Sequence, residues 1–195
     1  VTPDFSQVEA DAGVVDVNSR FATFYPERRP FFLEGSEIFR TPIEVVYTRR
    51  IADPLYGVKL TGKQGGSSVG VLQALDRSSG DAVATLPDAL NPYFGHDAAY
   101  QIVRVRQDVL KNSTVGLFAG SREQLATYNR GAGLDGRFAF RDKWAFQWQA
   151  LKSWAKARDY RGAIAGLTPA EDVALDDDLR GQVGGTTEGS AWTAA

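Results

Sequence analysis

Residues 143–150, KWAFQWQA, place three large aromatic side chains at every second position of one short stretch. Trp144, Phe146 and Trp148 alternate there with smaller or polar residues. Successive side chains of an extended chain point to opposite sides, so the three rings share one side of a strand. The fold depends on what this side faces: a protein core, a sugar or a lipid.

Composition excludes several classes of function. The 195 residues carry 22 basic and 24 acidic side chains, so no global charge directs the chain to nucleic acid. There is no cysteine, which excludes disulfides and thiolate metal sites. His96 is the single histidine, stands beside Asp97 in an expected loop, and is interpreted as a surface residue. No cofactor and no metal are expected.

The start of the sequence, VTPDFSQ, shows no signal peptide, and the chain contains no methionine. We interpret it as a mature or excised piece of a protein. No run approaches the roughly 18 apolar residues that a membrane helix requires. Membrane-spanning strands give a much weaker signal, and this observation does not exclude them.

Period-two alternation divides the chain into three parts. Residues 1–42 show no sustained period and are interpreted as a lead-in or plug-like segment. Residues 43–154 alternate apolar and polar side chains between turn signals. Residues 155–195 read as a long acidic loop, with a short helix after Pro169 and a poorly defined end. The expected strands are 43–51, 57–63, 67–76, 99–109, 113–121, 130–141 and 143–154.

Connections between these strands alternate between short and long. Tight turns are expected at Gln64–Gly66, Lys111–Asn112 and Asp142, with longer loops over 77–98 and 122–129. Outer-membrane barrels combine short periplasmic turns, long external loops, an apolar outer face and a polar lumen. The pattern therefore predicts an all-β fold, part of an antiparallel transmembrane β-barrel of outer-membrane type with about seven strands. The N-terminus would lie on the periplasmic side. A soluble β-sandwich or barrel remains the alternative.

The two faces of the expected strands carry different side chains. Trp144 and Trp154 are ten residues apart, about 33 Å along an extended strand, which suits indoles at opposite membrane interfaces. The expected lipid-facing residues are Leu134, Phe138, Phe140, Trp144, Phe146 and Trp148. The expected lumen-facing charges are Lys59, Lys63, Arg104, Arg106 and Arg137, which would form either a solvated wall or a pathway for anionic solutes.

Three blocks of the N-terminal part resemble a known bacterial family, DUF5916. They are PDFSQVEADAG (3–13), RFATFYPERRPFFLEGSEIF (20–39) and YTRRI (47–51), and the similarity continues through GVKLTGKQGGSSVGVLQAL (57–75) to about residue 150. The resemblance implies a secreted bacterial protein whose C-terminal region resembles an outer-membrane barrel. It also implies an upstream carbohydrate-binding module, similar to family 9, that is absent from this chain. It implies no catalytic residues.

The N-terminal acidic residues allow two interpretations. Asp4, Glu9, Asp11, Glu27, Glu34 and Glu37 could include the acid and base of a glycan hydrolase. Alternatively, they pair with Arg20, Arg28, Arg29 and Arg40 and hold the segment against a polar barrel interior. The second interpretation is favoured. Expected anchors of a plug or lead-in are Arg28, Arg29, Phe31, Phe32 and Glu34.

The sequence therefore predicts the membrane-embedded barrel portion of a Gram-negative outer-membrane protein linked to carbohydrate binding or uptake. Its expected partners are outer-membrane lipid and, through the absent module, carbohydrate, but not nucleic acid. The alternative is a soluble β-rich glycan hydrolase or glycan-binding module that uses the acidic residues between positions 4 and 37.

Overall fold

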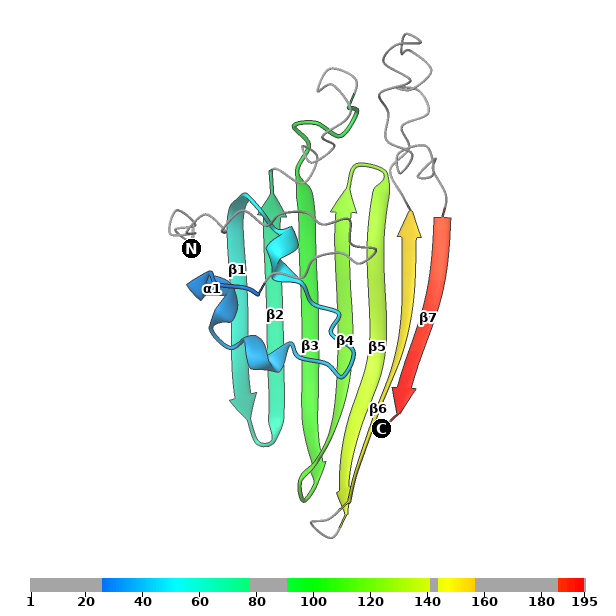
Figure 1. Ribbon diagram of the computed structural model, residues 1–195. Helices are drawn as coiled ribbons and strands as arrows, with labels where there is room; N and C mark the ends of the chain where they lie inside the picture. Colours follow the sequence, from blue (N-terminus) through cyan, green and yellow to red (C-terminus); the bar gives the residue numbers. More distant parts are fainter. Residues whose placement is uncertain (1–25, 78–90, 141–143, 157–185, 195) are drawn as a thin grey trace.

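The chain forms a single antiparallel sheet of seven strands, which follow one another in the order β1-β2-β3-β4-β5-β6-β7 (Figure 1). The computed structural model describes residues 26–77, 91–140 and 144–156, and the backbone of 186–194. Every neighbouring pair of strands is antiparallel. The expected all-β, antiparallel fold is confirmed. Among the described residues, β1 and β7 are each paired on one side only.

The strands are long, and most exceed the expected bounds at one or both ends. They are β1 (Pro54–Gln64), β2 (Ser67–Asp76), β3 (Ala98–Leu110), β4 (Ser113–Gln124), β5 (Thr127–Phe140), β6 (Trp144–Lys156) and β7 (Thr186–Ala194). The β1–β2 turn places Gly65 at φ 57° and Gly66 at φ 84°. Both angles suit a two-residue hairpin, since glycine adopts positive φ without steric cost. The tight turns at Gly65–Gly66 and at Lys111–Asn112 are as expected.

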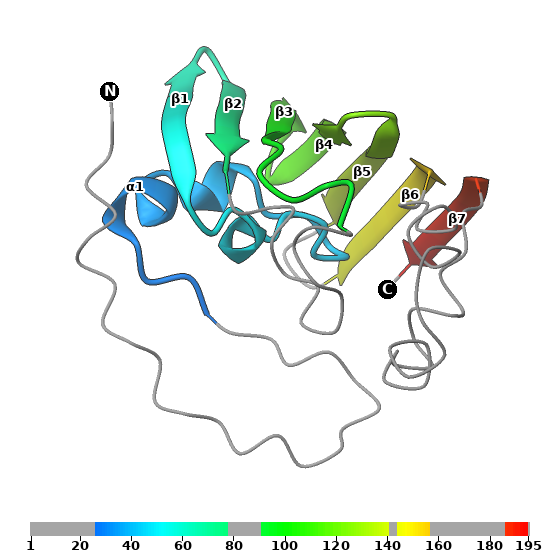
Figure 2. The ribbon, with the colours of Figure 1, turned by 90° about the horizontal axis from the view of Figure 1, so that it is seen from above.

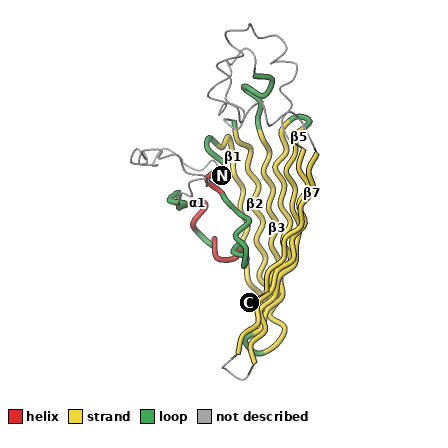
Figure 3. The backbone as a smooth tube through the Cα atoms, turned by 45° about the vertical axis from the view of Figure 1, so that its right-hand side comes forward, coloured by secondary structure: helices red, strands yellow, loops and turns green. Residues whose placement is uncertain are grey.

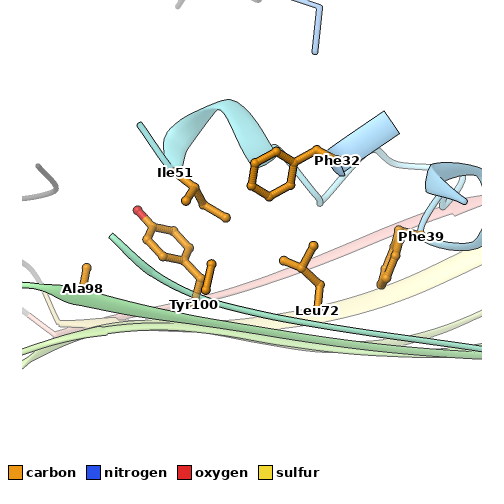
Figure 4. Packing of buried hydrophobic residues seen from close by; sticks show 7 residues of the cluster. Phe32, Phe39, Ile51, Leu72, Ala98 and Tyr100 are labelled. Carbon is orange, nitrogen blue, oxygen red and sulfur yellow. The ribbon is translucent and has the colours of Figure 1, made fainter. Parts of the chain in front are cut away.

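Residues 26–53, here called the strap, lie against one side of the sheet (Figures 2 and 3). The strap contains the short helix α1 (Pro30–Leu33) and two 3-10 turns, η1 (Ser36–Ile38) and η2 (Thr48–Arg50). Figure 4 shows the apolar cluster between strap and sheet. It comprises Phe32, Phe39 and Ile51 of the strap, Leu72 and Ala74 of β2, and Ala98 and Tyr100 of β3.

Three local expectations were wrong. Residues 43–51 are part of the strap, although Ile43, Val45 and Tyr47 alternate as in a strand; η2 turns the chain there, and the sheet begins at Pro54. The loop expected over 122–129 is a two-residue turn in which Leu125 adopts a φ of 51°. Strand β7 was not expected, because TTEGSAWTA lacks apolar alternation, yet its backbone pairs with β6.

The two long connections, residues 77–97 and 157–185, both follow an even-numbered strand and therefore leave the sheet at the same end. The other connections are two or three residues long. The short helix expected after Pro169 lies outside the described residues. None of the described helices is long and apolar enough to cross a membrane.

Candidate functional site

The two sides of the sheet differ in what covers them. Burial alternates along β2, where Ser68, Gly70, Leu72, Ala74 and Asp76 are buried and the residues between them are not. We call the side that carries Leu72 the covered face, because the strap packs on it, and the opposite side the open face. Residues paired directly across two strands share a face, so the register assigns every strand residue to one of them.

The open face carries the large apolar side chains. Trp144 is 76% exposed, Leu60 66% and Phe140 54%. Eleven further large hydrophobic residues of β1–β6 are at least 36% exposed. All six residues predicted to face lipid lie on this side, because the register pairs Phe140 with Trp144, Phe138 with Phe146 and Leu134 with Ala150. An apolar surface that extends over several strands marks an interaction site.

Aromatic rings on β5 and β6 are packed across the strands. Trp148 lies opposite Gly136, and a Cβ added to that glycine would lie 2.6 Å from the indole Nε1. The indole therefore covers the position of the missing side chain, which is why Gly136 is buried on the open face. The glycine at 136 makes room for Trp148 to lie flat against β5.

The covered face carries the charged side chains. Lys59, Lys63, Arg104, Arg106 and Arg137, predicted to face a lumen, all lie on it. Lys59 reaches the strap and donates hydrogen bonds to the carbonyl oxygens of Phe31 and Glu34. Lys63 pairs with Asp108, with Nζ and Oδ2 3.3 Å apart. The register places these five residues on one face, opposite the aromatic rings of β5 and β6.

One ion pair on the covered face spans three strands. Arg104 of β3 reaches across β4 to Asp135 of β5, with Nη1–Oδ1 and Nη2–Oδ2 distances of 2.6 and 2.8 Å. The arginine is 1% exposed. Between them lies Gly116, where an added Cβ would lie 2.8 Å from the Arg104 Cζ. The bidentate pair needs this glycine, because any side chain would occupy the space of the guanidinium.

Arg29 anchors the strap as predicted. Its Nη2 donates to the Thr48 carbonyl at 2.9 Å, its Nη1 donates to the Ile51 carbonyl, and its Cζ lies 4.2 Å from the centre of the Phe32 ring. Phe32 is buried in the core, and Phe31 packs edge-on against it with ring centres 5.0 Å apart. These bonds join the two ends of the strap to each other.

Two of the predicted anchors act differently from expectation. The Arg28 and Glu34 side chains are exposed. Arg28 contributes its backbone N–H, which donates to Glu27, and Glu34 contributes its carbonyl oxygen, which accepts from Lys59. Their backbones hold the strap where charged side chains were expected to do so.

Sequence reasoning missed Gln149 of β6. This side chain is 2% exposed, and its amide contacts the backbone of Ile43: Oε1 accepts from the N–H, and Nε2 donates to the carbonyl at 3.5 Å. The two residues are 106 positions apart in the chain. A polar residue on the polar side of KWAFQWQA was the only signal, and it did not indicate a partner.

The acidic residues do not form a catalytic pair within the described part of the chain. Asp4, Glu9, Asp11 and Arg20 lie outside the described residues, and the Glu34 and Glu37 side chains are exposed. Burial alone would raise the pKa of Glu27. Hydrogen bonds from Arg29 and Thr48 outweigh burial and lower that pKa from 4.5 to about 2. A carboxylate held ionised by an arginine is a structural anchor and a poor general acid.

A cavity of about 280 Å³ lies between strap and sheet. Its walls include Phe32 and Phe39 of the strap, Leu72 of β2 and Ile102 of β3, with Glu44 and Arg40 also lining it. Within the residues that the structure describes, no group of histidine, aspartate or glutamate side chains could hold a metal ion. The covered face is therefore best described as a packed and charged interior surface.

Comparison with known families finds a match for the N-terminal part of the chain. Residues 1–82 match the model of the family described as a domain of unknown function, DUF5916. The resemblance to DUF5916 is thus confirmed over the strap, β1 and β2, whereas the sequence suggested similarity to about residue 150. A search of curated proteins and a search of solved structures found no match.

Proposed function

We propose that this chain is the membrane-embedded part of a bacterial outer-membrane protein, with the open face toward lipid and the covered face toward a barrel interior. One observation carries the proposal. Large hydrophobic side chains are exposed on the open face, while Arg104, Asp135 and Gln149 are buried on the other face. A sheet folded for water has the opposite arrangement, with its apolar side covered. Apolar residues outside and polar residues inside are typical of transmembrane barrels.

In this proposal the barrel is completed by further strands. β1 and β7 each lack a neighbour on one side among the described residues, and unpaired backbone groups in lipid cost several kcal/mol each. Three of the four short connections would face the periplasm, and the β4–β5 turn and the two long connections would face the exterior. The strap, whose two ends are joined through Arg29 near the outer end of β1, would then lie in the interior and act as a plug.

The link to carbohydrate binding or uptake rests on the DUF5916 resemblance and belongs to the proposal. The chain would supply the membrane part, and a separate module would supply the sugar contacts. The alternative of a hydrolase using the acidic residues is not favoured by any described contact. Glu27, the acidic residue with the most contacts, is engaged by Arg29 and Thr48.

Two neighbouring residues of β6 provide the test. Phe146 lies on the open face and Gln147 on the covered face, and both are exposed. A carboxylate on the lipid face between the interface and the bilayer centre costs about 1 kcal/mol, so Phe146→Asp should lower insertion into lipid vesicles by roughly fivefold. Gln147→Asp, placed opposite Arg137, should insert as the wild type does. Equal insertion of both variants, or a wild-type chain that stays in the aqueous fraction, would contradict the proposal.

A further inference from the structure

The cavity between strap and sheet has walls that are largely apolar. Its floor includes Leu72 of β2 and Ile102 of β3, which the register places opposite each other. Figure 4 shows Phe32 of the strap facing Leu72 across the space between strap and sheet, with Phe39 beside them. The volume of about 280 Å³ is near the lower end of the roughly 300–1,000 Å³ that is typical of small-molecule sites. The cavity therefore suits a small ligand with an apolar body.

The two phenylalanine rings of the wall are held by residues that do not line the cavity. The Arg29 Cζ lies 4.2 Å from the centre of the Phe32 ring. Phe39 covers Gly70 of β2, where an added Cβ would lie 2.9 Å from the Cζ of the ring. Moving either ring into the cavity would break these contacts. The space is therefore preformed, as in most small-molecule sites.

The polar side chains that line the cavity are of two kinds. Glu27 and Thr48 are engaged with each other, because the Thr48 hydroxyl donates to Glu27 Oε2 at 2.6 Å. Arg40 and Glu44 also line the cavity, and both are exposed at its opening. Within the described part of the chain, neither Arg40 nor Glu44 forms an ion pair. One positive and one negative side chain at the opening are thus available to a ligand.

The segment that carries Arg40 and Glu44 is anchored to the sheet. The Thr41 hydroxyl donates to the Ile43 carbonyl at 2.6 Å, and Gln149 of β6 bonds to the N–H and the carbonyl of Ile43. The two charged side chains therefore extend from backbone that is already fixed beside the cavity. This arrangement reduces the conformational entropy that is lost when they close on a ligand.

We propose that this cavity binds a small zwitterion with an apolar body, which is the chemistry of an apolar α-amino acid. The body lies between the two phenylalanine rings and the floor of the cavity. The carboxylate accepts paired N–H bonds from Arg40, whose planar guanidinium matches two carboxylate oxygens. The ammonium group donates to Glu44. Apolar burial supplies the affinity, and the two charges select molecules that carry both signs.

This binding site goes beyond the proposed membrane role. The strap, β2 and β3 form the cavity on the covered face, whatever the open face contacts. Insertion into vesicles therefore tests the proposed function, and ligand binding tests this inference. A chain that inserts but binds no zwitterion contradicts only the inference.

The test measures binding to the full chain in detergent micelles at pH 7, by calorimetry, with four probes. L-phenylalanine carries both charges and an apolar body. 3-Phenylpropionate lacks the ammonium group, 2-phenylethylamine lacks the carboxylate, and glycine lacks the apolar body. The Kd of L-phenylalanine should be about fivefold lower than that of either charged analogue, because each lost charge pair at an exposed site weakens binding by up to about that factor. Glycine should show no measurable binding.

Two charge variants should show opposite selectivity. Arg40→Gln should raise the Kd of L-phenylalanine about fivefold and leave that of 2-phenylethylamine unchanged. Glu44→Gln should raise the Kd of L-phenylalanine by a similar factor and leave that of 3-phenylpropionate unchanged. The matched controls are Arg50→Gln and Glu37→Gln, at exposed positions of the same strap that do not line the cavity. These controls should leave every Kd unchanged.

A third variant tests the apolar part of the site. Ile102→Trp should fill the cavity and abolish binding of all probes, whereas Val103→Trp, on the open face, should bind them as the wild type does. Circular dichroism checks that each variant keeps its sheet. If Ile102→Trp does not fold, the variants at the exposed positions 40 and 44 decide the matter.

Three results would overturn the inference. The first is a folded wild-type chain that does not bind L-phenylalanine. The second is an Ile102→Trp variant that folds and binds as the wild type does. The third is binding of L-phenylalanine that neither Arg40→Gln nor Glu44→Gln weakens, because the site would then not recognise a zwitterion.

Discussion

Gly116 illustrates how one missing side chain sets the chemistry of the covered face. An added Cβ would lie within 2.8 Å of the Arg104 Cζ, so Gly116→Ala should displace the guanidinium from Asp135. Breaking a buried ion pair costs about 3 kcal/mol, because a buried charge is left without its partner. Unfolding of the full chain by denaturant in detergent should show this loss.

Gly62→Ala is the control for Gly116→Ala. Gly62 lies in β1, where an added Cβ would meet no atom within 4 Å. Its replacement should change the free energy of unfolding by less than about 1 kcal/mol, since only the intrinsic preference of the residue changes. Equal losses for the two alanine variants would show that Gly116 does not act through Arg104.

Glu27 makes the stability of the strap depend on pH. Its pKa is about 2 in the folded chain and 4.5 when unperturbed, so between these values the unfolded chain binds more protons. The stabilisation is complete above pH 4.5 and is lost as the pH falls toward 2. Its size follows from the pKa difference and is at most about 3 kcal/mol.

Unfolding measured at several pH values would test this dependence. Glu27→Gln should remove the slope between pH 4.5 and 2, because the titrating group is gone. Glu44→Gln, at an exposed position of the same strap, should keep the slope. A wild-type slope that survives in Glu27→Gln would assign the pH dependence to another group.

At the scale of elements, the strands with strong alternation were found from the sequence. β2 and β5 are examples, since their open faces carry Val69, Val71 and Leu75 in β2, and Leu134, Phe138 and Phe140 in β5. Prediction from alternation was wrong at residues 43–51. Ile43 and Tyr47 follow the alternating pattern of a strand, but the 3-10 turn η2 ends the extended conformation there. Alternation also failed to predict β7. The backbone of this strand pairs with β6, and residues 157–185 separate the two strands in the sequence.

The strap shows the same limit of prediction from local sequence patterns. Its hydrophobic anchor Phe32 and its charged anchor Arg29 were predicted, because PERRPFFLEG combines rigid, apolar and basic residues in ten positions. Gln149 was not predicted, since its partner Ile43 lies 106 residues earlier. Local patterns identify which segments are apolar or extended. They do not identify the partner of a polar side chain on a distant strand.

Gln149 should hold the middle of the strap against β6. Gln149→Leu removes both hydrogen bonds to Ile43 and leaves its partly buried N–H without a partner, while its carbonyl keeps the bond from the Thr41 hydroxyl; the expected loss is about 1–2 kcal/mol. Limited trypsin digestion should then cut the strap after Arg40 faster than in the wild type. Gln147→Leu, two residues away on the same face, should not change the rate. An unchanged rate in Gln149→Leu would mean that the strap is held elsewhere.

At the scale of the whole molecule, the sheet has its buried charges on the side that the strap covers and its exposed apolar residues on the other side. The covered face holds the strap and the buried charges, while the open face presents the aromatic residues of β5 and β6. Both long connections leave one end of the sheet, together with the β4–β5 turn, and the other three short connections lie at the opposite end. In the proposed bilayer, an apolar face toward lipid and a charged face away from it would both lower the free energy.

The tryptophans of β6 can report how the sheet lies in such a bilayer. Trp144, Trp148 and Trp154 share the open face, and Trp144 and Trp154 lie near opposite ends of the strand. Indole side chains favour the membrane–water interface, so Trp144 and Trp154 should lie at shallow depth, one in each leaflet. Trp148 is four residues from Trp144, about 13 Å along the strand, and should lie deeper.

Three single-tryptophan variants of the full chain, with the other tryptophans replaced by phenylalanine, would measure this order in vesicles. Lipids brominated near the headgroup should quench Trp144 and Trp154 most strongly, and lipids brominated near the chain end should quench Trp148 most strongly. Acrylamide, an aqueous quencher, should reach Trp148 least. If acrylamide quenches all three equally and neither brominated lipid quenches any of them, the open face meets water or protein, and KWAFQWQA belongs to a soluble surface.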